Sequence, residues 1–306
     1  MQLGFVSAIL SDRSLEEVLN TAARLGYDCV EAMCWPPSKA DRRYAGVTHL
    51  DATLAAAELI DQAAAVTGSS GIAISGLGYY PNCLAANREE ADRAVEHLQR
   101  LIQLAPKLGL NRVNTFIGRD HTLSVDDNWP RLLETWKPIV QLAEDHGVFI
   151  GIENCPMYFT RDEWPGGKNI ATSPAIWRRL FNDLPSPNLG LNFDPSHFVW
   201  QQMDYVRPLR EFADRLFHLH LKDAQLLRER LNDVGIFAHP KEYHIPRIPG
   251  RGEIDWAAFF RCLHEIGYSG AACVEVEDPD FENSLAARED SLELSQRYLR
   301  PLVGGS

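Results

Sequence analysis

The chain alternates between short apolar segments and longer segments with helical spacing, and this alternation continues along its whole length. The short segments are typical of β-strands, while the longer ones repeat apolar residues three and four positions apart. Such a repeat predicts an α/β fold with parallel strands, because a crossover helix joins each strand to the next. The eight expected strands cover residues 2–7, 28–33, 71–77, 111–117, 147–153, 188–194, 215–221 and 271–277.

Eight strand and helix units within 306 residues, with no linker or break in composition, predict one domain over residues 1–306 and a closed (β/α)8 barrel. A doubly wound dinucleotide-binding sheet would need a Gly-rich turn after its first strand, and Ser7-Ala-Ile-Leu-Ser11 does not supply one. The loops expected at the C-terminal face of the barrel are uneven in length. The longest, residues 222–253, is the predicted lid or insert after the seventh strand.

Charge and composition argue against two classes of partner. The chain has 30 Lys and Arg against 42 Asp and Glu, a formal net charge of −12, which disfavours nucleic acid. No stretch approaches the roughly 20 apolar residues of a membrane span, and no basic leader precedes the first strand, so we expect no membrane partner and a cytoplasmic location. The six cysteines form no CxxC pair and are expected to be reduced. The sequence leaves open a homo-oligomer.

Polar residues recur near the ends of the last four expected strands. With a period of two, one set of side chains faces the surrounding helices and the other faces the barrel interior. The interior set carries a Glu, an Asp, a His and a Glu toward the C-terminal mouth of the barrel. These four residues are Glu153, Asp194, His220 and Glu275.

Three carboxylates at one mouth would repel one another, and a divalent cation would remove that cost. Three carboxylates and one imidazole, without a cysteine ligand, suit Mn²⁺, Mg²⁺, Co²⁺ or Fe²⁺ better than a structural zinc ion, and Mn²⁺ is the expected metal. The alternative for each acid is a salt bridge to a Lys or Arg of a neighbouring strand. The convergence of all four residues favours the metal site.

Further polar residues follow the same strands. His197 lies three residues after Asp194, where it is either a substrate hydrogen-bond partner or a histidine of a surface turn. His218 should lie deeper in the barrel than the metal histidine, in a supporting or core position. Lys222 either holds a substrate oxygen or neutralises one of the acids, and Glu277 should lie farther out, as a lid or solvent contact.

Aromatic residues are expected in several of the loops at the mouth. Their faces suit sugar rings, and packing beneath long loops is the alternative. The tryptophans concerned are Trp35, Trp129, Trp164 and Trp200. Of these, Trp35 is the predicted substrate contact, together with His197, Lys222 and Arg251.

Five motifs extend along the chain in order and resemble those of one family. They are Ile152-Glu-Asn154, Asn192-Phe-Asp-Pro-Ser-His197, His218-Leu-His-Leu-Lys-Asp223, Pro249-Gly-Arg-Gly-Glu-Ile-Asp-Trp256, and Gly267-Tyr-Ser-Gly270 leading to Val274-Glu275. The chain resembles the xylose isomerase-like superfamily of TIM barrels, the sugar phosphate isomerase/epimerase group. This group includes ketose 3-epimerases, hydroxypyruvate isomerase, inosose dehydratase and endonuclease IV.

The resemblance implies that Glu153, Asp194, His220 and Glu275 bind one divalent metal. It also implies that Glu153 and Glu275 move protons on opposite faces of a sugar, while His197 contacts a substrate oxygen. The chain departs from the ketohexose 3-epimerases at Leu226, where those enzymes usually carry an Arg. It also lacks the extra histidines of the endonuclease branch, since its third and fourth strands end in Leu77-Gly-Tyr-Tyr80 and Asn114-Thr-Phe116.

The first functional hypothesis is therefore a metal-dependent sugar isomerase or epimerase without a nucleotide cofactor. Proton abstraction next to a carbonyl would proceed through a metal-stabilised enediolate. The alternative is a lyase of the same superfamily, which dehydrates a 2-keto-inositol or eliminates the β-substituent of a 3-keto-glycoside. A third hypothesis, from a different class, is a non-catalytic sugar-binding subunit.

Overall fold

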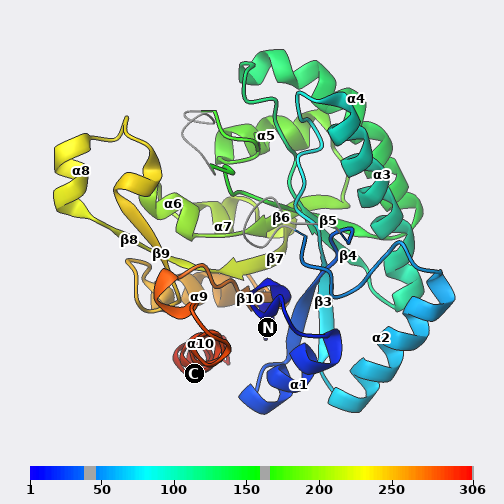
Figure 1. Cartoon of the computed structure of the whole chain (residues 1–306). Helices are drawn as coiled ribbons and strands as arrows, with labels where there is room; N and C mark the ends of the chain where they lie inside the picture. Colours follow the sequence, from blue (N-terminus) through cyan, green and yellow to red (C-terminus); the bar gives the residue numbers. More distant parts are fainter. Residues whose placement is uncertain (38–45, 159–165, 305–306) are drawn as a thin grey trace.

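The computed structural model describes residues 1–37, 46–158 and 166–304. Eight parallel strands close into a barrel in the order β1-β10-β7-β6-β5-β4-β3-β2 (Figure 1). The strands are β1 (Gln2–Val6), β2 (Cys29–Met33), β3 (Ala73–Gly78), β4 (Arg112–Thr115), β5 (Phe149–Glu153), β6 (Leu189–Phe193), β7 (Leu216–Leu221) and β10 (Ala271–Val274). Each lies within three residues of an expected strand at both ends, and the predicted (β/α)8 barrel is confirmed.

Helices surround the barrel, and several begin at residues whose side chains satisfy free backbone N–H groups. Ser14 accepts from the backbone N–H of Glu17, whose carboxylate accepts from the N–H of Ser14, so the capping box is complete. The α-helices are α1 (Leu15–Leu25), α2 (Ala56–Ser70), α3 (Arg88–Leu104), α4 (Val125–Asp145), α5 (Pro174–Asp183), α6 (Ser196–Trp200), α7 (Arg207–Glu211), α8 (Arg228–Val234), α9 (Trp256–Glu265) and α10 (Leu285–Val303). Short 3-10 turns are η1 (Ser7–Leu10), η2 (Ala105–Leu108), η4 (Ala213–Arg215), η5 (Pro240–Glu242) and η6 (Pro279–Phe281). Within the described ranges, none of the helices combines the length and the apolar content needed to cross a membrane.

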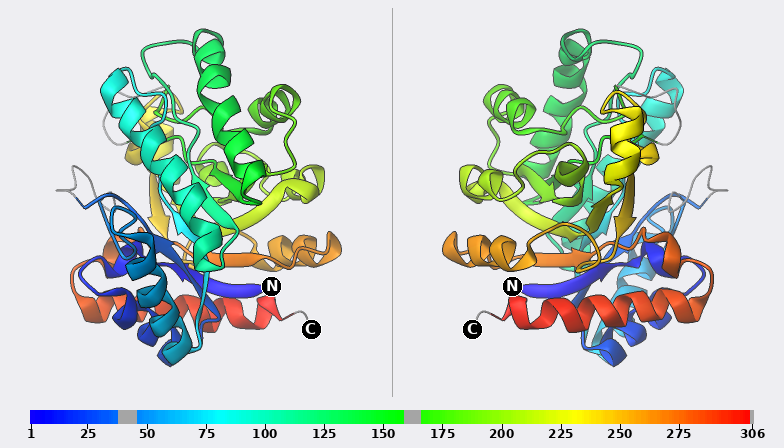
Figure 2. Two further views of the ribbon diagram at one scale, coloured as in Figure 1. Left: turned by 90° about the vertical axis from the view of Figure 1, so that its right-hand side faces the viewer. Right: turned by 90° about the vertical axis from the view of Figure 1, so that its left-hand side faces the viewer.

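The last helix of the chain packs against its first strand and first helix. Helix α10 runs beside β1 and α1, so that the first and last elements of the chain lie side by side (Figure 2). Tyr27 donates a hydrogen bond to the carbonyl of Leu292 at 2.7 Å, and Arg300 pairs with Asp28 at 2.7 Å. These contacts couple β1 and β2 to the last helix and help to keep the barrel closed.

Close packing around β1 requires glycine at position 4. A Cβ atom there would lie 2.7 Å from the Sγ of Cys29 and 2.8 Å from the Sγ of Cys273, on the two strands that flank β1. Both thiols are free and buried, as are those of Cys34, Cys83 and Cys262, while the free thiol of Cys155 is half-buried. The cysteines of β2 and β10 therefore act as small core side chains.

The long segment after β7 contains secondary structure that the sequence did not predict. Strands β8 (Asp223–Leu226) and β9 (His244–Arg247) form an antiparallel hairpin, with α8 and η5 in the connection between them (Figure 1). The buried carboxylate of Asp223 anchors this insert, because it accepts hydrogen bonds from the backbone N–H groups of Ala224, Gly250 and Ile254 and from the indole of Trp256.

Candidate active site

The structure brings together the four residues that the sequence singled out. Glu153 is the last residue of β5, Asp194 directly follows β6, His220 lies on β7, and Glu275 directly follows β10. His220 Nδ1 is 3.7 Å from Glu153 Oε2 and 3.6 Å from Glu275 Oε2. Lys222 Nζ links Asp194 to Glu275, because it lies 3.1 Å from Asp194 Oδ2 and 2.6 Å from Glu275 Oε2. Neighbouring parallel strands all end at this mouth, which is why residues so distant in sequence meet.

Three buried polar atoms of this cluster have charged neighbours but make no hydrogen bond of suitable geometry with a described residue: Asp194 Oδ2, His197 Nε2 and His220 Nδ1. A buried polar atom without a partner is costly, and such atoms are rare in folded proteins. Carboxylate oxygens and an imidazole nitrogen that converge in this way fit a divalent cation. Glu153, His220 and Glu275 also have ligand atoms within 4.8 Å of one another. The residues present therefore suit the metal that the sequence predicts.

Lys222 is buried among the acids. Its ammonium group pairs with Asp194, Glu275 and Glu277, the last at 2.9 Å. Burial alone would lower the pKa of Lys222, but these carboxylates outweigh it and raise that pKa well above its usual value. Burial likewise opposes ionisation of Glu275, and Lys222 and His220 outweigh it, so the pKa of Glu275 is lowered. The salt bridges considered as the alternative are thus present for Asp194 and Glu275, whereas the carboxylate of Glu153 has ion-pair contacts with His197 and His220 among the described residues.

Sequence reasoning missed Glu31, a fully buried carboxylate on β2. Its Oε2 lies 2.7 Å from His220 Nε2, and its Oε1 accepts a hydrogen bond from the hydroxyl of Tyr80. Burial opposes ionisation of Glu31, but His220 and His218 outweigh it and lower the pKa of Glu31. An ionised carboxylate can only accept, so His220 Nε2 carries a proton, and Nδ1 is the ring nitrogen that faces Glu153 and Glu275. A charged residue inside the apolar run Cys29-Val-Glu-Ala-Met33 was the available signal.

The two other histidines near the mouth differ in position. His197 lies on α6, with Nε2 3.2 Å from Asp194 Oδ2 and 3.5 Å from Glu153 Oε1. His218 lies deeper, as expected, with Nδ1 3.0 Å from the side-chain oxygen of Asn192. Burial lowers the pKa of His218 to about 3, so this imidazole is neutral. His197 therefore lies beside two of the acids at the mouth, and His218 lies in the interior of the barrel.

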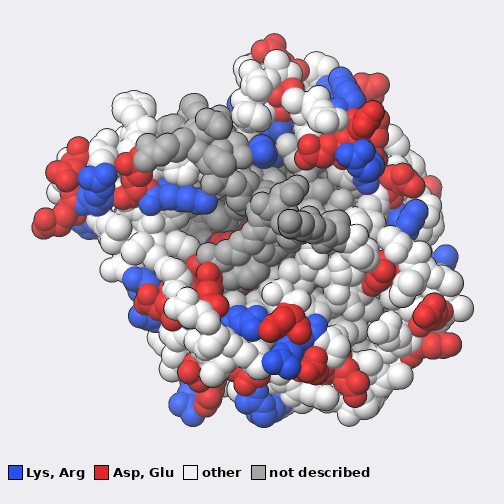
Figure 3. Space-filling model, viewed as in Figure 1, with Lys and Arg blue, Asp and Glu red and all other residues white. Residues whose placement is uncertain are grey.

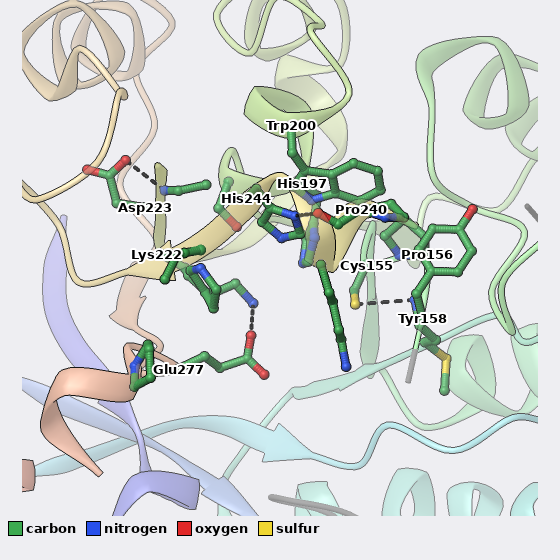
Figure 4. A pocket seen from close by; sticks show the side chains of 17 residues that line it. Cys155, Pro156, Tyr158, His197, Trp200, Lys222, Asp223, Pro240, His244 and Glu277 are labelled. Carbon is green, nitrogen blue, oxygen red and sulfur yellow. Dashed lines mark hydrogen bonds and ion pairs between the residues drawn. The ribbon is translucent and has the colours of Figure 1, made fainter. Parts of the chain in front are cut away.

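Figure 4 shows the lining of a cavity of about 470 Å³. His197 and Lys222 line it and contact the cluster, whereas Glu153, Asp194, His220 and Glu275 are not among the lining residues. His197, Lys222 and Glu277 lie along one part of it, and Trp200 stacks on His244 of the hairpin with ring centroids 5.4 Å apart. The insert after β7 thus forms a wall of the cavity. The lining residues are Cys155, Pro156, Met157, Tyr158, Ser196, His197, Trp200, Lys222, Asp223, Ala224, Pro240, Lys241, His244, Ile245, Pro246, Glu277 and Pro279.

Two of the predicted substrate contacts, Arg251 and Trp35, do not line this cavity. Arg251 pairs with Asp278 at 3.2 Å and with Asp280 at 2.9 Å, and it is not among the residues that line the cavity. Trp35 packs edge-on against Tyr79 and does not line it either. Of the other tryptophans, Trp200 lines the cavity, and Trp164 lies outside the described residues.

The surface of this face is mixed in charge. Lys and Arg are interspersed with Asp and Glu around the central hollow (Figure 3). In this view, neither the basic nor the acidic side chains of the described residues form one broad area.

Comparisons with known proteins agree with this architecture. The sequence profile of the xylose isomerase-like TIM barrel family matches residues 19–302. Protein YfiH of Bacillus subtilis is 25% identical over 315 residues, which cover 91% of this chain and 93% of YfiH. Inosose dehydratase of Clostridium perfringens is 34% identical over 204 residues, 64% of this chain and 67% of that enzyme. Other inosose dehydratases match over about half of their length. The crystal structure of a D-psicose 3-epimerase in the presence of D-fructose superimposes with a TM-score of 0.72 at 16% identity, covering 100% of both chains.

Proposed function

The chain belongs to the xylose isomerase-like TIM barrel family, and from this premise we propose that it is a divalent-metal-dependent sugar isomerase or epimerase. The observation that carries the proposal is the buried His220 Nδ1, which makes no hydrogen bond with a described residue. Carboxylate oxygens of Glu153 and Glu275 lie 3.7 and 3.6 Å from it, and Asp194 lies at the same mouth. Names of related proteins support the reaction class, since relatives include sugar epimerases and inosose dehydratases.

Glu153, Asp194, His220 and Glu275 would hold the metal. When bound, Mn²⁺ or a similar cation would polarise a substrate carbonyl and make the neighbouring C–H more acidic. Glu31 holds the tautomer of His220 that leaves Nδ1 free as a ligand atom.

The two glutamates are the proposed acid and base. They project from β5 and from the end of β10, and both lie within 4 Å of the same imidazole nitrogen, at 3.7 and 3.6 Å. A sugar bound between them would present its α-carbon to one carboxylate on each face. One glutamate removes the proton at its carboxylate oxygen, and the other returns a proton, to the same carbon in epimerisation or to its neighbour in isomerisation.

Lys222 and His197 would bind the substrate oxygens. Both line the cavity. His197 Nε2 makes no hydrogen bond with a described residue, so binding a substrate hydroxyl group would break none. Trp200, stacked on His244, offers an aromatic surface to a sugar ring at the same cavity.

A lyase is the second candidate. The match to inosose dehydratase and the presence of Leu226 in place of the epimerase arginine favour it. The same proton abstraction expels a β-substituent if the ketone carries one, so the residues keep their roles and only the product differs. A non-catalytic binding subunit is less well supported, because all four metal positions and both proton-transfer glutamates are present together.

The test is to load the protein with Mn²⁺ and incubate it in D₂O with ketohexoses, inososes and 3-keto-glycosides, following each by NMR and mass spectrometry. Deuterium incorporation with the carbon skeleton and oxygen count intact would establish the isomerase or epimerase. Loss of water or of an aglycone would establish the lyase. The Glu275→Gln variant is the control, since it should produce neither change.

A further inference from the structure

Cys155 stands apart from the other cysteines of the chain. It lies two residues beyond Glu153 and lines the cavity, and it is the one thiol of six that is not fully buried. Its sulfur, a carboxylate oxygen of Glu153 and a ring nitrogen of His197 lie within 4.8 Å of one another. This group, which we call the thiol site, is distinct in composition from the oxygen-rich cluster of Glu153, Asp194, His220 and Glu275.

The two carboxylate oxygens of Glu153 face different neighbours. Oε2 lies 3.7 Å from His220 Nδ1, on the side of the oxygen-rich cluster. Oε1 lies 3.5 Å from His197 Nε2, on the side of the thiol site. A carboxylate in this position can bridge two cations, one held by each oxygen.

His197 supplies an independent sign that a ligand belongs here. The residue is only 8% exposed, and its Nε2 makes no hydrogen bond with any described residue despite lying 3.2 Å from Asp194 Oδ2. This buried nitrogen therefore has two acidic neighbours, Asp194 and Glu153, but no hydrogen bond of suitable geometry with a described residue, an arrangement that suits an ion held at this position.

The side chain of Asn169 holds the main chain of Glu153 and Cys155 in place. The side-chain amide of Asn169 donates to the carbonyls of Glu153 at 2.9 Å and of Cys155 at 2.8 Å. The N–H of Met157 donates to the sulfur of Cys155 at 3.4 Å (Figure 4). Both ligand-bearing residues are thus fixed by the same amide, so little reorganisation is needed to bind an ion.

We propose that Glu153, Cys155 and His197 form a second cation site that prefers Zn²⁺ or another soft or borderline divalent ion. Thiolate and imidazole ligands favour such ions, whereas carboxylate-rich sites accept Mn²⁺ and Mg²⁺. Bonds of about 2.0 to 2.3 Å to oxygen, nitrogen and sulfur would draw these three ligand atoms, which lie within 4.8 Å of one another, around one ion. Three protein ligands also leave a fourth position open toward the cavity.

Occupation of the thiol site has a consequence for the proposed function, on which this part of the inference rests. The ion takes Glu153 Oε1 and His197 Nε2, which are the groups proposed to meet the substrate. Zn²⁺ added to the Mn²⁺-loaded enzyme should therefore inhibit it, and Cys155→Ser should relieve the inhibition.

The direct test is spectroscopic and needs no substrate. The Mn²⁺-loaded protein is titrated with Co²⁺, and near-ultraviolet absorption is followed for sulfur-to-cobalt charge transfer. Wild type and the control Cys262→Ser, on α9, should both develop this band. Cys155→Ser and Cys155→Ala should lack it, and His197→Gln should require more Co²⁺ to reach half of the signal.

A wild-type protein that binds Co²⁺ without the charge-transfer band would overturn the proposal, as would a band that persists in both Cys155 variants. An unchanged titration midpoint in His197→Gln would refute the assigned ligand set. Sugar turnover without the band would remove the thiol site and leave the proposed function intact. The band without turnover of any sugar in the panel would support the thiol site and count against the proposed function.

Discussion

Glu31 Oε2 lies 2.7 Å from His220 Nε2, and both side chains are fully buried inside the barrel. The contact joins β2 to β7, two strands that are not neighbours in the sheet. Because the carboxylate fixes the proton of His220 at Nε2, it decides which ring nitrogen is offered to a metal. A residue outside the proposed metal and substrate ligands thereby controls the proposed site.

Glu31→Gln should weaken Mn²⁺ binding by about 10- to 100-fold, which is the usual cost of losing a carboxylate that orients a metal-ligating histidine. Calorimetric titration of the metal-free protein measures this directly. Tyr80→Phe is the matched comparison, because it removes the hydroxyl that donates to Glu31 and keeps the carboxylate. Equal Mn²⁺ affinity in wild type and Glu31→Gln would show that Glu31 does not position His220.

Glu153→Gln and Glu275→Gln should each lower kcat by roughly 10²- to 10⁴-fold, since each removes a proposed acid or base. Steady-state kinetics on the substrate identified in the D₂O experiment provides the measurement. Glu277→Gln is the control: its carboxylate also pairs with Lys222, but its side chain is 34% exposed and it is outside the proposed catalytic pair. Near-wild-type kcat in either of the first two variants would eliminate the two-glutamate mechanism.

Lys222→Met should destabilise the metal-free protein by about 3 to 5 kcal/mol, because it leaves buried carboxylates without their partner. A bound cation can replace the lost positive charge. The increase in Tm on adding Mn²⁺ should therefore be larger in Lys222→Met than in wild type, as thermal unfolding with and without metal will show. The same increase in Tm in both proteins would mean that the ammonium group and the metal do not neutralise the negative charge of the same carboxylates.

The stability of the metal-free protein should fall in acid. The pKa of Glu275 is lowered from 4.5 and that of Asp194 from 3.8, because Lys222 and a nearby histidine outweigh the effect of burial. A depressed pKa in the folded state contributes stability that is complete above the unfolded value and is lost as the pH falls through the folded value. Urea unfolding below pH 4.5 should show this loss. Glu275→Gln should flatten the pH dependence, and an unchanged slope would contradict the assignment.

The free energy of unfolding should respond oppositely to alanine at two glycines. Gly4→Ala should cost about 1 to 3 kcal/mol, because the new methyl group would overlap the carbonyl and sulfur of Cys29 and the sulfur of Cys273. Gly68 lies in α2 with no described atom within 4 Å of the added Cβ, so Gly68→Ala should stabilise by up to about 1 kcal/mol. Urea denaturation compares the two variants. A neutral Gly4→Ala would show that the strands beside β1 can move apart.

The barrel and the residues at its mouth are predictable from the sequence, because both follow from local periodicity. Alternation along a strand separates helix-facing from interior side chains, and this pattern is enough to assign Glu153, Asp194, His220 and Glu275 to one mouth. Parallel strands end at the same edge, and this geometry converts sequence positions into spatial neighbours.

The side-chain contacts across the barrel depend on the tertiary structure. Nothing local indicates that Glu31 reaches His220 or that Arg251 pairs with Asp278 and Asp280. The sequence left open whether Lys222 neutralises an acid or holds a substrate oxygen, and its three carboxylate contacts appear only in the folded chain. The hairpin of β8 and β9 is likewise held by Asp223 through hydrogen bonds to residues up to 33 positions away. Such contacts depend on how strands and loops are brought together in space, and a periodic pattern along the chain does not contain that information.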